Sequence, residues 1–463
     1  MFPYDWLNRE AKFDEPQLPP KEYFESSLTE EPITDEDYAH ANRTWQAFEC
    51  KTFRDYVETY LKADVLQLAD IFESFRDTCL KFYDLDPAPY LSSPNYTWDD
   101  MLKMTDVQLD LITDPEIFRM LDQGMRGGIS TITRRHAKAN NKYMDDRYNP
   151  NLPSKYIVYL DANNLYGWAM VQPTAYGGFE WMSKEELEVI ENELKKGIYT
   201  SLGDNQEKGY YFDIDADYPQ DLHPFHNDYP MAPEHMTVNL EMLNPIQATI
   251  RSKYNMPRRS EQTKLIQNLN PKRNYIVHYR NLKFYMIHGL SLNKINRGIK
   301  FKQAPWIAQY IQLNTTLRAK AENDFEKDKL KLFNNALFGK TCENQQKWAD
   351  IKLVVKEEKA EKYLTKSNLK SFRIFHESLV GFEFNKINTY INKPFYVGFT
   401  VLELSKLLMY EFHYDFIVPR FGSNAKLLFT DTDSLMYEIE TEDVYKDVAK
   451  QGKILLVRIC KGF

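Results

Sequence analysis

Hydrophobic and polar positions alternate with a helical period across residues 53–83. Apolar side chains recur there at steps of three and four, with charged residues between them: Leu61, Val65, Leu68, Phe72, Phe75 and Cys79. This spacing predicts one long amphipathic helix. The pattern becomes helical again from Pro305 to Asn344. The segment "NKPFYVGFTVLELSKLLMYEFHYDF" predicts a strand or turn that leads into a further helix.

Two other stretches have the pattern of strands, and both contain acidic residues. In "KYIVYLDANNLYGWAM" a short apolar run ends at Asp161, and Asn163 and Asn164 begin a turn. In "LLFTDTDSLMYEIE", residues 427–440, Asp431 and Asp433 interrupt an apolar strand. A continuous strand would place these two carboxylates on one face, about 7 Å apart. Because like charges are costly in a poorly solvated core, the pattern predicts a metal or a proton there.

The composition is that of a soluble globular protein with more than one domain. The chain has 463 residues, of which 43% are hydrophobic and 27% charged. Its four cysteines form no CxxC pair, and the sequence contains neither an apolar run of membrane-spanning length nor a signal-like start. We therefore expect a soluble, intracellular protein without a membrane partner. Residues 1–40, with eleven acidic residues against three basic ones, are expected to wrap over a surface without a core of their own.

Positive charge is concentrated in residues 251–303. Thirteen Lys and Arg stand there against Glu261 alone, interleaved with tyrosine and phenylalanine. This mixture suits a phosphate backbone and stacked bases, but a solvated basic stripe explains it equally well. Upstream, Gly127 and Gly128 beside Arg126 predict a loop whose backbone can approach a phosphate, or a simple Gly-Gly turn.

The stretch "KLFNNALFGK" supplies a third chemical element. On a helix, Lys331, Asn335 and Phe338 share one face, and Gly339 beside them permits close approach. An ammonium, an amide and a ring in this arrangement suit the phosphates and base of a nucleotide. Two Mg²⁺ ions about 4 Å apart would give the carboxylates a role, with Asp161 and Asp433 as bridging ligands. Taken alone, Asp161 is also an ordinary turn or N-cap residue.

Three motifs together resemble a known family. "DANNLYGWAM", "KLFNNALFGK" and "FTDTDS" resemble motifs A, B and C of family B DNA polymerases, in the protein-primed branch of organellar, viral and Maverick/Polinton-like elements. The resemblance implies that Asp161, Asp431 and Asp433 are catalytic, with Asp161 and Asp433 as the ligands of two Mg²⁺ ions, which Mn²⁺ can replace. It further implies contacts to the incoming dNTP from a steric gate and from motif B: Tyr166, Lys331, Asn335, Phe338 and Gly339.

The same resemblance implies an α+β right-hand polymerase fold with an antiparallel palm sheet and helical fingers. Residues 1–120 would hold the acidic segment and the remnant of a ribonuclease H-like exonuclease domain, and residues 121–463 the polymerase domain. Within the latter we expect palm at 155–180 and 395–463, a first insertion at 181–300, fingers at 301–345 and a second insertion at 346–394, with the thumb missing from what is a fragment. "YLKADV" resembles the third exonuclease motif, with Tyr60 and Asp64, but no first motif precedes it, so no editing is expected.

The expected partners are primer-template DNA, dNTPs and a terminal protein that supplies the priming hydroxyl. Candidate DNA contacts lie in the Gly-Gly loop and the basic stretch: Arg126, Gly127, Gly128, Arg258, Arg259, Lys272 and Arg273. Two alternatives remain. A reverse transcriptase would share the two-metal chemistry and would copy RNA, whereas a non-catalytic remnant would bind DNA without incorporating nucleotides.

Overall fold

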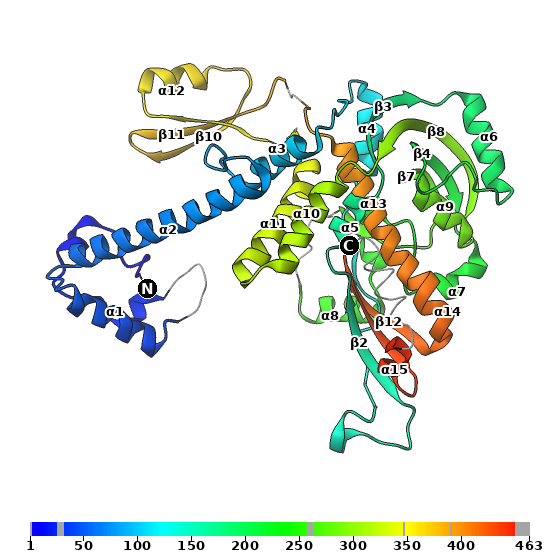
Figure 1. The fold of residues 1–463 in the computed structure, drawn as a ribbon, viewed down its shortest axis with the longest axis horizontal. Coiled ribbons are helices and arrows are strands. Elements are labelled where there is room, and N and C mark those ends of the chain that lie inside the picture. Colours follow the sequence, from blue (N-terminus) through cyan, green and yellow to red (C-terminus); the bar gives the residue numbers. More distant parts are fainter. Residues whose placement is uncertain (1, 26–31, 257–262, 346–347, 389–390, 450–463) are drawn as a thin grey trace. The chain divides into compact units, whose positions relative to one another are not determined.

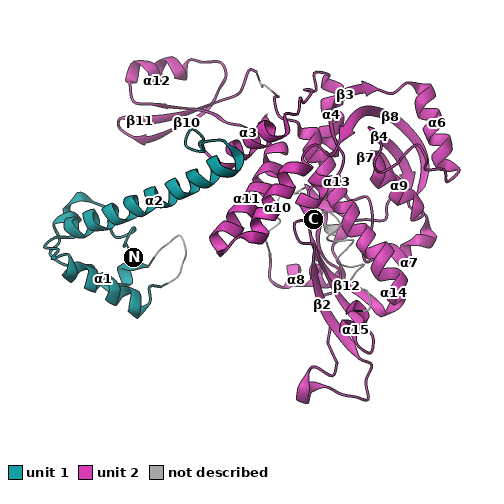
Figure 2. Ribbon diagram, in the orientation of Figure 1, with its two compact units in different colours: residues 1–91 teal, residues 92–463 magenta. Residues whose placement is uncertain are grey.

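The computed structural model describes residues 2–25, 32–256, 263–345, 348–388 and 391–449; the candidate DNA contacts Arg258 and Arg259 lie outside them. The chain divides into two compact units, residues 1–91 and 92–463 (Figure 2). Its fold is mixed α and β, and every sheet in the described residues is antiparallel. No helix among those residues has both the length and the apolar character needed to cross a bilayer.

The first unit has a core of its own, contrary to the expectation for the acidic N-terminus. Helix α1 (Asp35–Ala47) begins at Thr34, whose hydroxyl accepts a hydrogen bond from the Asp37 amide. Its Ala41 is fully buried and packs with residues of the acidic segment and of the next helix: Leu18, Phe24, Ile33, Cys50, Phe53 and Tyr56. The apolar residues scattered among the charges are sufficient to build this small cluster, which the charge count obscured.

Helix α2 (Phe53–Tyr83) spans the predicted range, and a capping box between Thr52 and Asp55 stabilises its N-terminus. The residues that it buries lie near its two ends: Phe53, Tyr56, Cys79 and Tyr83. The predicted apolar stripe is mostly exposed in the structure, including Leu61 (56%) and Leu68 (65%). Helical periodicity therefore located the helix correctly, but the apolar spacing did not predict which of its residues are buried.

In the second unit, one four-stranded sheet carries the acidic motifs. Its strands run in the order β1 (Ser130–Ile132), β12 (Ala425–Asp431), β13 (Ser434–Glu440) and β2 (Lys155–Asp161). Strands far apart in the sequence thus become neighbours (Figure 1).

A second four-stranded sheet is built from the middle of the chain. Its order is β3 (Thr174–Trp181), β8 (Ser291–Ala304), β4 (Lys208–Asp217) and β7 (Lys272–His278). Helix α6 (Lys184–Lys195) packs on β8, and α9 (Tyr279–Ile287) on β4 and β7. Shorter elements complete the region: α7 (His223–His226), β5 (Glu234–Thr237), α8 (Pro245–Lys253) and β6 (Thr263–Ile266).

Helix α13 (Phe395–Glu411) forms the centre of this unit, and all but its last residue are buried. It contacts β3, β7 and the helices α4 (Pro115–Gly124), α5 (Leu165–Val171), α9 and α11 (Asp324–Thr341). A π-helical turn, Phe412–Ile417, joins it to α14 (Val418–Phe421). Because this helix is apolar on all sides, the periodicity of its sequence is weak.

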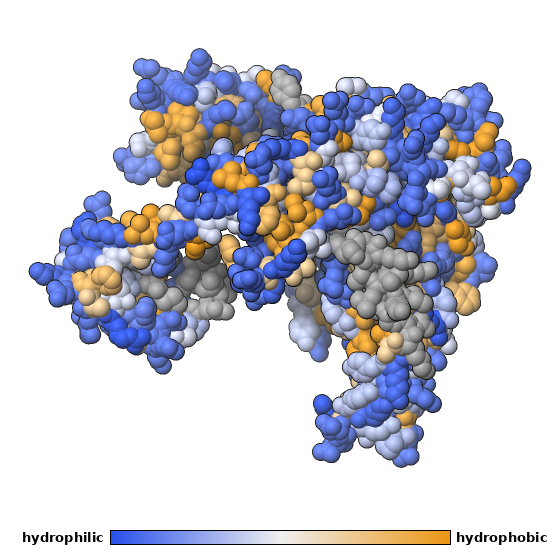
Figure 3. All heavy atoms as spheres, viewed as in Figure 1, coloured by the Kyte–Doolittle hydropathy of each residue, from blue (hydrophilic) through white to orange (hydrophobic). Residues whose placement is uncertain are grey.

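Helix α11 packs against α3 (Ser93–Thr105) and α10 (Ala308–Lys320). A small sheet follows it, with strands β9 (Asp350–Val354), β10 (Leu369–His376) and β11 (Leu379–Phe384), and α12 (Glu357–Leu364) packs on it. Figure 3 shows hydrophobic surface over this small sheet, which agrees with the exposure of Leu353 and Ile374. The last described helix is α15 (Val444–Ala449).

Candidate active site

The acidic pair of the third motif lies on a hairpin and not on one continuous strand. Strand β12 ends at Asp431, β13 begins at Ser434, and Thr432 and Asp433 form the turn between them. Thr432 has a positive φ of 55°, and the Asp433 amide donates to the Asp431 carbonyl at 2.6 Å. The expectation that strand alternation puts both carboxylates on one face is therefore wrong, because the chain reverses between them.

Strand β2 brings the first-motif aspartate to this turn. Asp161 pairs with Ser434, and the amide of the next residue, Ala162, donates to the Asp433 carbonyl at 2.7 Å. The pKa of Asp433 is raised, first by burial and next by the nearby charge of Asp161. Lys331 acts in the opposite direction and favours the charged carboxylate. Negative charge is thus concentrated at one end of the sheet, with an ammonium facing it.

The rings of the first and second motifs are stacked. Tyr166 lies in α5 directly after the turn that follows Asp161, and α5 packs against α11. The Tyr166 and Phe338 rings are parallel to within 12°, with centroids 4.1 Å apart. Burial, followed by the proximity of Cys342 and Asp433, raises the pKa of the Tyr166 hydroxyl. The stack therefore forms a half-buried wall beside the acidic turn.

Helix α11 presents the predicted polar face to solvent. Lys331, Asn335 and Gly339 are exposed, and Phe338 is half-buried beside them. A side chain at Gly339 would meet nothing within 4 Å, so the helix surface is open there. The opposite face packs on α3 and α10, where Phe333 contacts Tyr96 with ring centroids 5.7 Å apart.

The Gly-Gly loop lies against the acidic turn. A Cβ on Gly128 would come within 2.3 Å of the Thr432 hydroxyl, so only glycine permits this approach. The Thr432 amide donates to the Ile129 carbonyl at 2.7 Å, and Ser130 pairs with Asp431. A Cβ on Gly127, in contrast, would meet nothing within 4 Å. The loop thus supports the turn through backbone contacts.

Arg126, the cation of this loop, is buried and does not face solvent. Its guanidinium donates to the Ile276 carbonyl at 2.7 Å and lies 3.8 Å from the centre of the Tyr275 ring. The Arg126 carbonyl accepts a hydrogen bond from Lys406, which is itself buried and paired with Glu403. Sequence reasoning missed Glu403 and Lys406, although two opposite charges inside an apolar helix were a visible signal.

Much of the basic stretch is neutralised by acidic residues from other parts of the chain. Lys272 is buried, with its ammonium 2.7 Å from Glu234. Arg273 bridges to Asp217, and Arg297 to the buried Asp213. These two aspartates lie on β4, beside the basic strands β7 and β8. The local charge of +12 in the sequence therefore does not become a uniformly basic surface.

The two residues of the exonuclease-like motif lie on α2. Tyr60 and Tyr4 share a hydrogen bond of 2.7 Å between their hydroxyls, which is the main reason that the pKa of Tyr60 rises to about 12. Asp64 is exposed one turn further along the helix. The structure places this pair in the first unit, whereas the other candidate residues that it describes belong to the second.

The donor set at the acidic turn suits a hard divalent cation that has few protein ligands. Within residues that the structure describes, no group of three or more His, Cys, Asp or Glu side chains is arranged around a metal position. Asp161 and Asp433 form a pair whose mutual repulsion contributes to the raised pKa of Asp433. Mg²⁺ commonly takes one or two carboxylates and completes its shell with water and substrate phosphates, so this pair fits it.

Comparison with known proteins identifies the family. The family model described as DNA polymerase type B, organellar and viral, matches residues 1–417. The chain therefore belongs to the family B DNA polymerases of the organellar and viral type. No curated protein matches the chain.

Among solved structures, a phi29 DNA polymerase complexed with primer-template DNA is similar, at 14% sequence identity and a TM-score of 0.45 over 90% of this chain. A phi29 DNA polymerase complexed with single-stranded DNA has 16% identity and a TM-score of 0.43, also over 90% of the chain. In both cases the chain covers 55% of the length of the phi29 enzyme.

Proposed function

We propose that this chain carries out template-directed DNA synthesis, in which a primer hydroxyl attacks the α-phosphate of a dNTP and pyrophosphate leaves. The observation that carries the proposal is the meeting of three separate motifs at one end of the β1–β12–β13–β2 sheet. Asp161 and Asp433 lie beside each other, Lys331 faces them, and Tyr166 stacks on Phe338. This sheet would belong to the palm, α10 and α11 would be the fingers, and residues 1–120 would hold the exonuclease remnant.

Each residue has a defined task in this proposal. Lys331 and Asn335 bind the triphosphate from the exposed face of α11, where an ammonium acts as a point charge for phosphate. The open surface at Gly339 lets the nucleotide approach the helix closely. Tyr166, held by its stack on Phe338, excludes a ribose 2′-hydroxyl.

Asp161 and Asp433 would hold two Mg²⁺ ions, which Mn²⁺ can replace, and Asp431 supports them from the end of β12. When bound, the metal ions activate the attacking hydroxyl and neutralise the charge of the leaving pyrophosphate. The role of the chain is to fix the two carboxylates. Strand pairing and the bond from the Ala162 amide to the Asp433 carbonyl do this before substrate binds.

Two further parts of the proposal concern partners. The first hydroxyl in replication comes from a terminal protein, as is typical of the protein-primed branch, and primer-template DNA is contacted by the backbone of Gly127 and Gly128. Arg126 and Lys272 are not among the proposed DNA contacts, because both side chains are buried and bonded within the fold. Tyr60 and Asp64 do not support editing.

The test is incorporation of a single nucleotide on a primed DNA template with Mg²⁺. We expect Asp433→Asn to lower the rate by about two orders of magnitude or more, because it removes a charged ligand while it keeps the size of the side chain. Asp146→Asn, in an exposed 3-10 helix (Asp145–Arg147) of the second unit, is the matched control and should leave the rate unchanged.

Equal rates for Asp433→Asn and the wild-type chain would contradict the proposal. If neither incorporates nucleotides but both bind primer-template tightly, the chain is a DNA-binding remnant. Incorporation on an RNA template at a rate similar to that on DNA would favour the reverse transcriptase alternative.

A further inference from the structure

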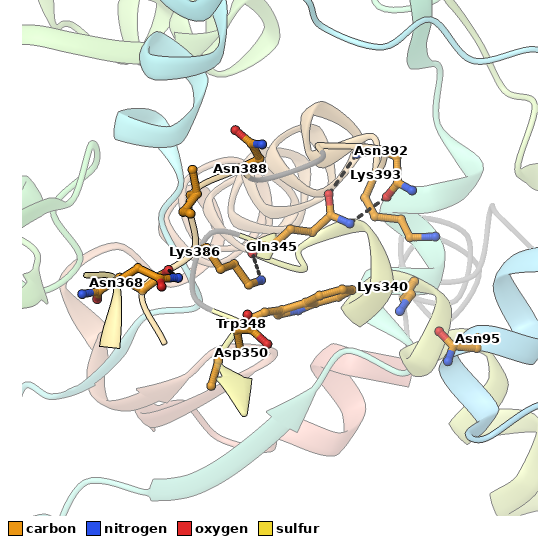
Figure 4. Close-up of a pocket in the computed structure, with 13 residues that line it drawn as sticks. Asn95, Lys340, Gln345, Trp348, Asp350, Asn368, Lys386, Asn388, Asn392 and Lys393 are labelled. Atoms are coloured by element: carbon orange, nitrogen blue, oxygen red, sulfur yellow. Dashed lines mark hydrogen bonds between the residues drawn. The ribbon is translucent and has the colours of Figure 1, made fainter. Parts of the chain in front are cut away.

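A cavity of about 620 Å³ lies where the small sheet β10–β11–β9 joins the rest of the second unit. Its walls come from the end of α11, from the segment before β9, and from the segment between β11 and α13. The side chains that matter for its chemistry are Lys340, Gln345, Trp348, Lys386, Asn392 and Lys393 (Figure 4). A cavity of this volume can hold a ligand of the size of one nucleotide.

The wall is held in place by hydrogen bonds between side chains and backbone. The Gln345 amide group donates to the Asn392 side chain at 2.7 Å, and the Asn392 backbone amide donates to the Gln345 side-chain oxygen at 2.9 Å. These reciprocal bonds join the chain entering the small sheet to the chain leaving it. The cavity is therefore preformed, which reduces the entropic cost of binding.

Positive charge in this cavity is only partly matched by negative charge, since Lys340 is paired with Glu343 at 2.8 Å but two further lysines have no such ion pair. Lys386 donates to the Gln345 carbonyl at 3.0 Å, and Lys393 lies 5.1 Å from the centre of the Trp98 ring. In the described part of the chain, neither ammonium forms an ion pair with a carboxylate, although the more distant Glu343 and Asp99 favour the charged form of Lys393. Burial, followed by repulsion from Lys340, lowers the pKa of Lys393. The carboxylate that lines the cavity, Asp350, is bonded to Lys352 at 3.0 Å. An anion would offset this imbalance.

An aromatic ring accompanies the charges. Figure 4 shows the Trp348 indole among these lysines, and 48% of this residue is exposed. The Lys386 ammonium lies 5.1 Å from the centre of its ring. A partly exposed indole beside unpaired ammonium groups offers a stacking surface and a phosphate site at the same place. Amide groups around the rim can bond the polar edge of a base.

We propose that this cavity binds a nucleotide, with its base against Trp348 and its phosphate at Lys386 and Lys393. The ligand would be either one unpaired nucleotide of a single strand or a free nucleotide, which share this chemistry. The proposal adds to the proposed polymerase function a binding site separate from the acidic turn, and it rests on that function only for the origin of the strand.

The experiment measures binding of oligodeoxythymidylate, thymidine monophosphate and inorganic phosphate to the full chain by calorimetry. The buffer contains a chelator, so that metal-dependent binding at the acidic turn does not contribute. We expect Lys386→Gln/Lys393→Gln and Trp348→Leu each to weaken binding of the oligonucleotide about tenfold or more. Lys370→Gln is the matched control, because Lys370 lies on the same small sheet outside the cavity and is bonded to Glu383.

The probes distinguish the two sources of ligand. Variant-sensitive binding of the oligonucleotide alone assigns the site to a strand, whereas equally sensitive binding of the monophosphate assigns it to a free nucleotide. The proposal is overturned if the cavity variants bind like Lys370→Gln, or if inorganic phosphate binds as tightly as both nucleotide probes. The result is independent of catalysis, since a chain that fails to incorporate nucleotides can still show variant-sensitive binding.

Discussion

At the scale of single residues, contacts that cross the chain decide what each side chain can do. Tyr166 and Phe338 come from different motifs, and their stack at 4.1 Å makes a wall that neither could form alone. Contacts across the chain remove a possible role from Arg126, because its guanidinium packs on the Tyr275 ring and donates to the Ile276 carbonyl inside the fold. The family resemblance implied a nucleotide contact for Tyr166, and the sequence around Arg126 suggested a DNA contact, but burial determines which role is available to each side chain.

The Tyr166 stack gives a prediction about sugar selectivity. Replacing Tyr166 by Val removes the ring, so we expect ribonucleotide incorporation relative to deoxynucleotide incorporation to rise about tenfold or more. Tyr166→Phe keeps the stacked ring and should keep the selectivity. Competitive incorporation of the two nucleotides on a primed template measures the ratio, and an unchanged ratio in the Val variant would remove Tyr166 from the proposed gate.

At the scale of elements, the acidic hairpin depends on the loop before β1. Gly128 lies against Thr432, and the Ile129 carbonyl accepts a bond from the Thr432 amide at 2.7 Å. Lys406 of α13 donates a hydrogen bond to the carbonyl of Arg126, at the start of the same loop. A helix, a loop and a hairpin that are distant in sequence therefore position the two carboxylates together.

Gly128→Ala tests this support. We expect a loss of stability of about 1 to 3 kcal/mol and slower incorporation, because the new methyl group overlaps Thr432. Gly127→Ala is the matched control for stability, since its Cβ would enter open space, and it should change the free energy of unfolding by less than about 0.5 kcal/mol.

Chemical unfolding and single-nucleotide incorporation measure the two effects. Adding Thr432→Gly to Gly128→Ala should restore both, because it removes the overlapping side chain and glycine suits the positive φ at this position. If Gly128→Ala and Gly127→Ala had the same free energy of unfolding, the close packing of the loop on the turn would not contribute to stability.

At the scale of the whole molecule, buried titratable groups other than the proposed catalytic carboxylates couple stability to pH. Burial lowers the pKa of His226 to about 4 and that of His413 to about 3, and raises the pKa of Asp100 to about 7. The histidines are neutral in the folded chain and take up protons on unfolding, so they reduce stability as pH falls below about 6.5. Asp100 stays protonated when folded and loses its proton on unfolding, so it reduces stability as pH rises from about 4 to 7.

Asp100→Asn removes the carboxyl group that reduces the stability of the folded chain as pH rises. We expect the variant to be more stable than the wild-type chain above pH 7, by about 4 kcal/mol at most, and their difference to shrink as pH falls toward 4. Asp99→Asn, at the exposed neighbouring position, should leave the pH dependence of stability unchanged. Urea unfolding at several pH values measures this, and parallel curves for wild type and Asp100→Asn would contradict it.

The sequence by itself determined the local elements and the chemical residue types. The helix over 53–83, the strand that ends at Asp161 and the polar face of α11 are local patterns of hydrogen bonding and hydrophobic spacing, so they can be read without a fold. The three motifs also indicated the family, which the match over residues 1–417 confirms.

Only the tertiary structure decided which of these groups meet and which are buried. It turned the presumed strand through Asp431 and Asp433 into a hairpin, and it paired the basic strands with the acidic β4. It also buried Arg126 and Lys272. The burial of Arg126 and the ion pairs of Arg273 and Arg297 depend on residues more than fifty positions away along the chain. A local pattern carries no information about the partner that a distant segment supplies.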